Sequence, residues 1–492
     1  MAKSADICLV VEGSYPYVTG GVSSWLQWLM ENLEELSFAV VALVAEEKKE
    51  EDRRYRFPEN VVSYQEFDIF DTTEIEASAP LRISRKRWAA LSEGLYRLMT
   101  EWKEGRLSEG SIETLREVIF ELSPGVFRNF FQDEAAFSLL TRLYEEFRGD
   151  AGFLKYFYNV RNIHLILYRL LTLLPRVPEA AVYHSPGTGY GGLVTCLKAV
   201  LDDRAGLITE HGIYLQEREM ELLKSEWLDD AYLKEMWIDS FSALCLWQYN
   251  TCDRIVTLFE GNRRLEEDYG ADPERIQVIP NGIDIPRFLE ARRERCRTRP
   301  PTVGFVGRVD AVKDIKTFIQ VVALIRQTLP DVRALAVGPT DDQPGYYQEC
   351  RDLVKMLGLG ETLTFTGPAD VIPYYREMDV LLLTSIKEAM PLAVMEAMAS
   401  GLPVVATDVG ACRELLLGEG DGIGEAGAVR RVMDAEGIAE AALAVLRDPA
   451  AADRMAENGI RRIENRYGED LVLKRYRDLY RELMHGRHRT AG

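Results

Sequence analysis

The sequence predicts an α/β protein built from two doubly wound domains, each with a mostly parallel sheet and helices on both faces. In both halves of the chain, short continuous apolar runs alternate with helical patterns, as expected for strands that are buried on both faces of a parallel sheet. At the very start, apolar runs at Ile7–Val11 and Phe38–Ala45 flank a helical pattern over Ser23–Leu36. The highly charged Glu290–Arg299, followed by two prolines, indicates a linker between the halves.

Domain boundaries follow from changes of pattern along the chain. We expect a first domain over 1–285, a second over 286–465, and a final segment over 466–492 that packs back on the first domain. Between about 71 and 178, glycine becomes rare and Leu, Phe, Tyr and Arg recur at helical spacing. This stretch is predicted to be a helical insertion in the first domain, and its aromatic stripe, around Phe137–Phe147, is predicted to form internal core.

The other elements alternate regularly. Further strands are predicted at Ala180–His184, Leu207–Glu210, Arg254–Leu258, Gln277–Ile279, Val303–Val306, Ala334–Val337, Leu363–Phe365, Val380–Thr384 and Pro403–Ala406. Helices are predicted at Gly191–Leu201, across Leu215–Tyr249, up to Tyr269, and at Ile315–Thr328, Tyr347–Leu357, Val371–Met378 and Pro391–Ala399. From Glu436 onward the pattern is mainly helical. Ligands of such sheets bind beyond the carboxyl ends of the strands, so we expect the two domains to share a cleft there.

Composition excludes several classes of function. The 492 residues are 47% hydrophobic, which is enough for two or three domains with real cores. The formal net charge of −20 repels nucleic acid and anionic lipid at long range, although a local basic pocket for phosphates is compatible with it. The N-terminal residues show no signal-peptide pattern, and no apolar run has the length of a membrane span. We therefore expect a cytoplasmic protein, which a partner can hold at the inner membrane.

The cysteines favour a reducing compartment. Their number is odd, their spacing is wide, and no C-x-x-C pair is present, so the sequence does not indicate a zinc or redox site. Most of them stand in apolar runs and are predicted to be small core residues. They are Cys8, Cys196, Cys245, Cys252, Cys296, Cys350 and Cys412.

The most informative motif follows the predicted strand that ends at Thr384. Glu388 lies in the strand-to-helix turn, and Glu396 lies eight residues later, in the second turn of a helix that begins at Pro391, a position that proline favours. The amides of Met390 and Leu392 are expected to open this helix, where they can hold a phosphate. Glu396 can then accept hydrogen bonds from ribose hydroxyls, and Glu388 can reach a sugar. Spacing alone also allows a helix-start pair, with Glu388 acting on the helix dipole and Glu396 exposed.

A second motif places cations after another buried strand. Gly307 ends the run Val303–Val306, and Arg308 and Lys313 follow before the next helix, so both are expected at the same edge of the sheet. Two such cations suit a nucleoside diphosphate that departs with its electron pair, and no metal ion is then required. The alternative is an ordinary salt-bridged loop.

Two histidines and a glycine pair mark the first half. His211 directly follows a predicted strand and precedes glycine, and His184 ends the strand before it. Each is either a catalytic or binding group or a core or capping histidine. Gly20 and Gly21 precede a predicted helix, where the missing side chains let a backbone approach a ligand closely or simply form a turn. Gly422-Ile-Gly424-Glu-Ala-Gly427 matches a dinucleotide fingerprint but follows no clear strand, so we interpret it as a loop.

Several motifs together resemble the family 4 retaining glycosyltransferases of GT-B fold. They are Glu388-x7-Glu396, Gly307-Arg308 to Lys313, Ile279-Pro-Asn281-Gly-Ile-Asp284 and Gly401-Leu-Pro-Val-Val-Ala-Thr407-Asp-Val-Gly410. Three further stretches are similar to the PelF branch, which serves Pel exopolysaccharide synthesis. They are Glu12-Gly-Ser-Tyr-Pro-Tyr-Val-Thr-Gly-Gly-Val-Ser-Ser-Trp25, Thr209-Glu-His-Gly-Ile-Tyr-Leu-Gln-Glu-Arg218 and Gly410-Ala-Cys412-Arg413-Glu414.

This resemblance implies a role for each matching residue. Arg308 and Lys313 would bind the diphosphate of a UDP-sugar, Glu396 the ribose and Glu388 the donor sugar. His211 would contact the sugar near the reacting carbon. Further donor contacts would come from the amide of Gly21 and from Met390 and Leu392, and an acceptor or sugar pocket from His184, Tyr214, Arg218 and Asn281. The donor configuration would be retained, no metal or other cofactor would be needed, and a membrane-embedded polysaccharide synthase complex is the implied partner.

One position departs from the family pattern. Relatives usually carry glycine after the first Glu, whereas this chain has Ala389, which would cost about 1 kcal/mol if the backbone there needs a positive φ. Other functions stay open at this stage: a GT-B nucleotide-sugar epimerase, a phosphorylase, or a non-catalytic subunit of a synthase complex. The sequence does not name the sugar, the acceptor or the oligomeric state.

Overall fold

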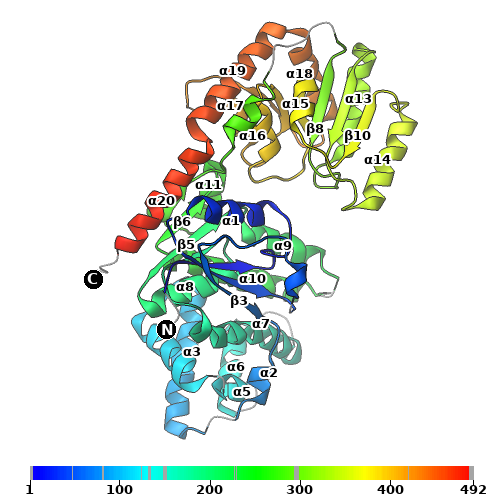
Figure 1. Ribbon diagram of the computed structural model, residues 1–492. Coiled ribbons are helices and arrows are strands. Elements are labelled where there is room, and N and C mark those ends of the chain that lie inside the picture. The colour runs from blue at the N-terminus through cyan, green and yellow to red at the C-terminus, as the bar shows by residue number, and fades with distance from the viewer. Residues whose placement is uncertain are drawn as a thin grey trace. The chain divides into compact units, whose positions relative to one another are not determined.

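Figure 1 shows the computed structural model, in which the chain forms two compact units. The first unit takes the chain up to Thr257, Arg263–Gln277 and the chain from Arg477; the second takes Leu258–Asn262 and Val278–Tyr476. Each unit contains one sheet, so the predicted class of two doubly wound α/β units is confirmed. The residues that the structure describes are 4–46, 48–79, 82–123, 125–130, 134–147, 152–226, 228, 230–292, 299–418 and 420–486.

The first unit is built on a seven-stranded sheet of order β3-β2-β1-β4-β5-β6-β7. The order reverses between β1 and β4, and in doubly wound sheets the ligand crevice opens at such a switch point. An edge strand, β3, was not predicted, because its alternating polar residues are mostly half-buried and leave no continuous apolar run. The strands are β1 (Ala5–Glu12), β2 (Phe38–Val44), β3 (Val61–Asp68), β4 (Ala180–Ser185), β5 (Ala205–Glu210), β6 (Arg254–Thr257) and β7 (Ile276–Val278).

Helices cover this sheet, and the insertion between β3 and β4 is helical, as predicted. In Figure 1, α3, α5 and α6 lie on the side of the sheet opposite to α1. The sheet is covered by α1 (Gly21–Asn32), α8 (Tyr190–Asp202), α9 (Tyr214–Lys224), α10 (Ala231–Thr251) and α11 (Glu260–Asp268). The insertion contains α2 (Thr73–Ala77), α3 (Arg85–Lys103), α4 (Glu109–Arg116), a π-helical turn (Glu117–Leu122), α5 (Gly125–Phe130), α6 (Glu134–Phe147), α7 (Phe153–Leu173) and a 3-10 turn (Leu174–Arg176).

Some aromatic side chains of the insertion are core, but the stripe on α6 is not wholly internal. Trp88, Tyr156 and Tyr168 are buried, whereas Phe137 is 50% exposed and packs against Phe153 with ring centroids 5.6 Å apart. The prediction of an internal stripe is therefore wrong at Phe137, because helical spacing shows which residues share a face but not whether another helix covers that face.

The second unit has a six-stranded sheet of order β10-β9-β8-β11-β12-β13, with its switch point between β8 and β11. Its strands are β8 (Thr302–Val306), β9 (Arg333–Val337), β10 (Leu363–Gly367), β11 (Val380–Leu383), β12 (Val404–Thr407) and β13 (Gly427–Arg430). Its helices are α12 (Ile285–Leu289), α13 (Ile315–Thr328), α14 (Pro344–Met356), α15 (Ile372–Glu377), α16 (Leu392–Ala399), α17 (Cys412–Leu417), α18 (Ala435–Arg447) and α19 (Pro449–Arg466), followed by α20 (Glu469–His485), which continues into the first unit.

The fold also bears on three further expectations, which concern the glycine loop, the cysteines and membrane-spanning helices. Gly422 and Gly424 lie in a loop with positive φ before β13, not after a strand, so the interpretation as a loop is confirmed. The six described cysteines are buried and unpaired, as expected of core residues, and Cys296, like most of the predicted linker Glu290–Arg299, lies outside the described residues. Within the described ranges, no helix combines the length and apolarity that crossing a membrane requires.

Candidate functional site

The switch point of the second unit brings Lys313 and Glu388 together. Lys313 follows β8 and Glu388 follows β11, and the Lys313 Nζ lies 2.5 Å from the Glu388 Oε1. The Ser385 hydroxyl donates to the same oxygen at 2.6 Å. The two side chains are 21% and 12% exposed, so the charged pair is partly shielded from solvent yet reachable. Motifs that lie 75 residues apart in the sequence thus meet at the place where such sheets bind ligands.

Backbone and side-chain hydrogen bonds fasten the loops that carry this pair. The Ile386 amide donates to the Val312 carbonyl at 2.8 Å, and the Thr384 hydroxyl donates to the Lys313 carbonyl at 3.0 Å. On the other side, the Lys313 amide donates to the buried Asp310 carboxylate at 2.9 Å. The position of the Lys313–Glu388 pair is therefore set by the fold and not by the pair alone.

Arg308 lies in the same loop but is much more exposed. Its guanidinium is 3.2 Å from Asp342 and 3.5 Å from Asp310, and its side chain is 62% exposed. Exposed ion pairs contribute little stability, so this guanidinium can exchange its partners for a phosphate at little cost. Both cations of the predicted motif therefore lie beyond β8, as the sequence indicated, and Asp310 contacts the Arg308 guanidinium and the Lys313 backbone amide.

The glycine at the end of β8 serves a close approach of two loops. Gly307 has φ +152°, and its carbonyl oxygen would lie 2.0 Å from a Cβ placed on Gly338, the residue that follows β9. Any side chain at position 338 would collide with the backbone that precedes Arg308. The turn that presents Arg308 thus depends on both glycines.

Glu396 occupies the second turn of α16, as predicted, and it is half-buried rather than exposed. The Tyr375 hydroxyl donates to its Oε2 at 2.8 Å. Burial raises the pKa of the Glu396 carboxyl, although the Tyr375 hydrogen bond and Arg287 act in the opposite direction. The alternative in which Glu396 is an exposed helix residue is therefore wrong.

The start of α16 differs from the prediction. Pro391 is the residue before the helix, with extended backbone (φ −73°, ψ 110°), and the helix begins at Leu392. Met390 therefore does not belong to the first turn: it is buried, and its sulfur accepts the Asn281 amide at 3.4 Å. This contact places Asn281, predicted for the acceptor pocket, at a core methionine of the second unit.

The loop after Glu388 does not need glycine at position 389. Ala389 is not among the residues with positive φ, so the departure from the family pattern carries no backbone strain. The glycine requirement falls instead on Gly410, which has φ +50° and whose Cβ would lie 2.0 Å from the Ala389 carbonyl oxygen. The Ala411 amide donates to that oxygen at 2.8 Å, so the loop after β12 holds the Glu388 loop in place.

The first unit has its own cluster at its switch point. Glu12, at the end of β1, accepts the amides of Tyr190 and Gly191 at the start of α8, at 2.8 and 3.2 Å. The Tyr214 hydroxyl lies 3.3 Å from the other Glu12 oxygen, and the Arg218 guanidinium lies 5.1 Å from the Tyr214 ring centroid. Burial raises the pKa of Glu12, while these neighbours favour its charged form. Tyr214 and Arg218, two residues predicted for a sugar pocket, therefore do lie together.

His211 is positioned as a group that a ligand can use. It follows β5, its ring packs against Trp25 with centroids 4.5 Å apart, and its Nε2 is buried without a hydrogen-bond partner among the described residues. Burial lowers its pKa to about 4, so the imidazole is neutral near pH 7. A buried nitrogen without a partner loses free energy, and a ligand hydroxyl would restore the missing hydrogen bond.

His184 is a core histidine, which corrects its assignment to a sugar pocket. It is fully buried, its Nδ1 lies 2.7 Å from the Tyr480 hydroxyl and its Nε2 lies 2.8 Å from the Thr209 hydroxyl. Both ring nitrogens are therefore occupied within the first unit, by α20 and β5. Burial lowers the pKa of His184 to about 3, so it is neutral and has no nitrogen left for a sugar.

The glycine pair at the start of α1 lies in open space. A Cβ on Gly20 or Gly21 would meet no atom within 4 Å, and the φ of Gly20 is −173°, which any residue adopts. The packing of the fold therefore does not require glycine here. The bare backbone at the start of a helix, beyond β1, suits the close approach of a ligand.

The sequence predicted no function for two carboxylates that the structure buries, Glu210 and Glu266. Glu210 accepts the Thr188 amide and hydroxyl at 3.1 and 2.6 Å and the Tyr214 amide at 3.3 Å, and burial raises its pKa to about 7. It thereby holds the loop that carries His211. Glu266 on α11 is also fully buried, and burial raises its pKa to about 9. Glu266 begins the acidic run Glu266-Glu267-Asp268 of a polar helix, a pattern that carries no sequence signal of such burial.

Comparisons with known proteins agree with this division of the chain. Residues 5–274, more than half of the chain, match the family described as Domain of unknown function (DUF3492), and residues 300–448 match the family described as Glycosyl transferases group 1. A D-inositol 3-phosphate glycosyltransferase of Nocardia farcinica is 34% identical over 172 residues, which are 32% of this chain and 38% of that protein. The lipopolysaccharide core biosynthesis mannosyltransferase LpsB of Rhizobium meliloti is 30% identical over 216 residues, 42% of this chain and 61% of that one. This chain thus spans less than two thirds of these curated relatives.

Solved structures share the fold over almost the whole chain. Alr3699/HepE of Anabaena, solved in complex with UDP, has a TM-score of 0.59 at 14% identity and covers 97% of this chain and 100% of its own. Sucrose-phosphate synthase of Thermosynechococcus elongatus has a TM-score of 0.57 at 18% identity, with 97% and 99% covered. These likenesses show that the two doubly wound units have the GT-B fold. The chain belongs to the family described as Domain of unknown function (DUF3492), and its second unit carries a domain of the family described as Glycosyl transferases group 1.

Proposed function

We propose that this protein is a retaining glycosyltransferase that moves a sugar from a UDP-sugar onto a growing exopolysaccharide of the Pel type. The observation that carries the proposal is the Lys313–Glu388 pair at the switch point of the second unit, with Arg308 exposed in the same loop. A nucleoside diphosphate brings negative charge to a site that already holds two cations. The Glu388 carboxylate accepts hydrogen bonds from sugar hydroxyls, whereas the two cations bind the diphosphate.

The donor contacts follow from the chemistry of each group. Arg308 and Lys313 bind the diphosphate and stabilise the charge that develops on it as the glycosidic bond breaks. The start of α16 at Leu392 adds amides and the positive end of a helix dipole. Glu396, held by Tyr375, accepts the ribose hydroxyls, and Glu388 accepts hydroxyls of the sugar. From the first unit, the bare backbone at Gly21 offers its amide to the phosphate.

The proposed transfer step needs no co-reactant. The acceptor hydroxyl oxygen bonds to the anomeric carbon on the same face from which UDP departs, and the bond from that carbon to the phosphate oxygen breaks. The hydroxyl proton passes to an oxygen of the departing diphosphate, which takes the electron pair. His211, neutral near pH 7, accepts or donates one hydrogen bond at the sugar without changing its charge. The proposal requires no metal ion.

The proposals for the acceptor and the partner rest on the resemblance of three sequence stretches and on the Tyr214–Arg218 pair. The stretches 12–25, 209–218 and 410–414 support the Pel branch, and Tyr214 with Arg218 offers an aromatic face and a cation of the kind that sugars contact. The curated relatives are named for transfer to inositol phosphate and to a lipopolysaccharide core, so the matching region is compatible with diverse acceptors. An exported polymer requires a membrane-embedded channel, and we therefore propose a polysaccharide synthase complex at the inner membrane as partner.

Thermal-shift titration with UDP, GDP, ADP and UDP-sugars tests the donor class. A ligand at about a hundred times its dissociation constant adds about 2.7 kcal/mol to the free energy of unfolding. We expect UDP and one UDP-sugar to raise the melting temperature and ADP to leave it unchanged. Stabilisation by GDP or ADP but not by UDP would contradict the proposed donor. Incubation of the UDP-sugar without acceptor separates a transferase, which leaves the sugar unchanged, from an epimerase, which changes its configuration.

A further inference from the structure

A cavity that the donor site does not use lies between the helical insertion and the helices α8 and α10. Its volume is about 260 Å³, and its wall is formed mainly by α3, α7 and α10. Protein interiors are packed to crystal density, with few voids larger than a water molecule, and an engineered apolar void of about 150 Å³ already binds benzene. A cavity of this size is therefore large enough to hold a ligand.

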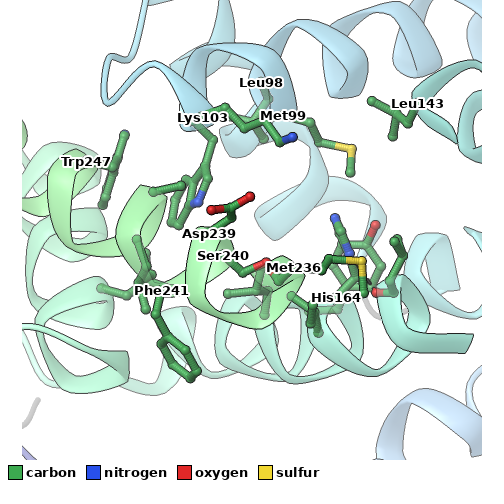
Figure 2. A pocket seen from close by; sticks show the side chains of 18 of the residues that line it. Leu98, Met99, Lys103, Leu143, His164, Met236, Asp239, Ser240, Phe241 and Trp247 are labelled. Atoms are coloured by element: carbon green, nitrogen blue, oxygen red, sulfur yellow. Dashed lines mark hydrogen bonds between the residues drawn. The ribbon is translucent and has the colours of Figure 1, made fainter. Parts of the chain in front are cut away.

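The lining of the cavity extends along two helices. Its lining runs along α10 from Tyr232 to Trp247 and along α7 from Tyr156 to Leu171. Fifteen residues of helix correspond to about 22 Å, since each residue rises 1.5 Å. Figure 2 shows Leu98 and Met99 of α3 on the side of the cavity opposite to Met236 of α10. A lining that extends this far along two helices fits a linear molecule better than a compact ring.

The inner wall is mainly apolar; the His164 and Ser240 side chains are hydrogen-bonded within their own helices, whereas the buried Trp247 Nε1 has no hydrogen-bond partner among the described residues. Most lining residues are leucine, methionine or aromatic residues. His164 bonds the Val160 carbonyl of its own helix at 2.7 Å through Nδ1, and burial lowers its pKa. The Ser240 hydroxyl donates to the Met236 carbonyl at 2.8 Å. Apart from the Trp247 indole N–H, the wall offers mainly apolar surface, and a chain of methylene groups would bury its whole surface here.

Charged side chains stand only at the exposed part of the described lining. Lys103, Glu235 and Asp239 line the cavity, and each is exposed to solvent. Figure 2 shows Lys103 and Asp239 between Trp247 on one side and Met236 and His164 on the other. An apolar interior with a charged rim matches an amphiphile, whose hydrocarbon chain lies inside while its polar head remains in water.

We propose that this cavity binds the hydrocarbon chain of an amphiphile, such as a fatty acid or the acyl chain of a lipid. The site lies within the first unit and does not depend on the proposed sugar transfer. Aromatic side chains nevertheless connect the cavity to the cluster around Glu12. Tyr190 and Phe241 line the cavity, and the Phe241 ring lies 6.0 Å from that of Tyr214. Tyr214 in turn bonds Glu12.

Tryptophan quenching tests the proposal on the full chain. Trp102, Trp237 and Trp247, three of the seven tryptophans, line the cavity. Dodecanoate that carries bromine on its terminal carbon, below its micellar concentration, is expected to quench their fluorescence saturably, and unbrominated dodecanoate is expected to reverse the effect. Absence of saturable, reversible quenching would overturn the proposal. Replacing Trp247 by Phe should reduce the quenched amplitude, whereas Trp28→Phe on α1 should not; the opposite result would place the chain elsewhere and also overturn it.

A filled cavity gives the matched control. Leu98→Phe with Ser240→Leu adds apolar volume inside the wall, and we expect it to weaken dodecanoate binding about tenfold or more. Leu223→Phe, at an exposed position of α9, should bind as the wild type does. Wild-type affinity in the folded filled variant would contradict the site. Vesicles of phosphatidylcholine with brominated chains separate the sources: quenching by vesicles indicates a chain presented by a bilayer, and quenching by the monomer alone indicates a free amphiphile.

Discussion

At Glu388, a single carboxylate oxygen accepts both the Lys313 ammonium and the Ser385 hydroxyl. The pair is held by loops whose backbones are bonded to each other, so the removal of one charge leaves the other in place. This arrangement suits a ligand that carries both phosphate and hydroxyl groups, because the Lys313 ammonium can bind the phosphate while the Glu388 carboxylate accepts hydrogen bonds from the hydroxyls.

We predict that Glu388→Ala abolishes sugar transfer while UDP still binds. The loss should exceed about 10²-fold in turnover, the usual cost of removing one positioned polar group from a transition state. Turnover with the UDP-sugar and a titration with UDP would measure the two effects. The control is Glu349→Ala, which removes the carboxylate of another lysine pair, Lys316–Glu349, 2.6 Å apart on α13 and α14. Wild-type turnover of Glu388→Ala would refute its role.

Tyr375→Phe should weaken donor binding without slowing the chemical step. The hydroxyl holds Glu396 by one hydrogen bond of 2.8 Å, and such a bond is worth about 1 kcal/mol, or roughly fivefold in affinity. The dissociation constant for UDP and KM for the UDP-sugar should rise together, with kcat nearly unchanged. The same substitution at the neighbouring Tyr374 serves as the control. A fall in kcat with unchanged KM would place Glu396 at the reacting sugar instead of at the ribose.

At the scale of elements, the loops that follow the strands are held by close backbone contacts. Gly410→Ala should disturb the Glu388 loop, because the new Cβ would lie 2.0 Å from the Ala389 carbonyl at a φ of +50°. Both melting temperature and turnover of the UDP-sugar should fall. Gly345→Ala on α14, where a Cβ meets nothing within 4 Å, provides the control and should lower neither. Unchanged turnover of the UDP-sugar by Gly410→Ala would mean that the Glu388 loop is not part of the donor site.

A substitution at the start of α1 should affect protein stability and donor affinity differently. Gly21→Ala adds a methyl group in open space at a helix position, so the free energy of unfolding should stay the same or rise by up to about 1 kcal/mol. Donor affinity should nevertheless fall if a phosphate approaches this backbone. Calorimetric unfolding and UDP titration on one preparation would measure the two effects separately. Undiminished donor affinity would remove Gly21 from the proposed site.

At the scale of whole units, buried titratable groups of the first unit make its stability depend on pH. Burial raises the pKa of Glu266 to about 9, from an ordinary value near 4.5. The unfolded chain therefore releases this proton between about pH 4.5 and 9 while the fold retains it. The stability that protonated Glu266 contributes is fully present below pH 4.5 and is lost as pH rises to about 9.

Glu266→Gln should remove this pH dependence. At pH 8 the variant should unfold at a higher temperature than the wild type, by several degrees, because the amide carries no ionisation penalty. At pH 4.5 the two proteins should melt alike. Thermal unfolding by circular dichroism at both pH values measures the difference, with the exposed Glu349→Gln as a control that should show none. A pH-independent offset would mean that Glu266 is already ionised in the fold.

The fold class and the Lys313–Glu388 pair could be predicted because both depend on local order in the chain. Apolar runs of strand length and helical spacing set the elements, and parallel strands bring their following loops to one edge of the sheet. The edge strands β3 and β13 were missed, since an edge position imposes no continuous apolar run. The start of α16 was off by one residue for a related reason: a proline fits both just before and just inside a helix.

What remained unpredictable depends on partners that are remote in the chain. His184 is a core residue only because Tyr480, 296 residues later, meets its Nδ1. Tyr375 reaches Glu396 across two elements, and the cavity exists only because α3, α7 and α10 leave space between them. Local pattern decides which face of an element is buried, but the contacts of a side chain depend on which distant segments pack against that face. That pairing is a property of the assembled fold, because burial and hydrogen bonding are satisfied jointly by all the elements of a core.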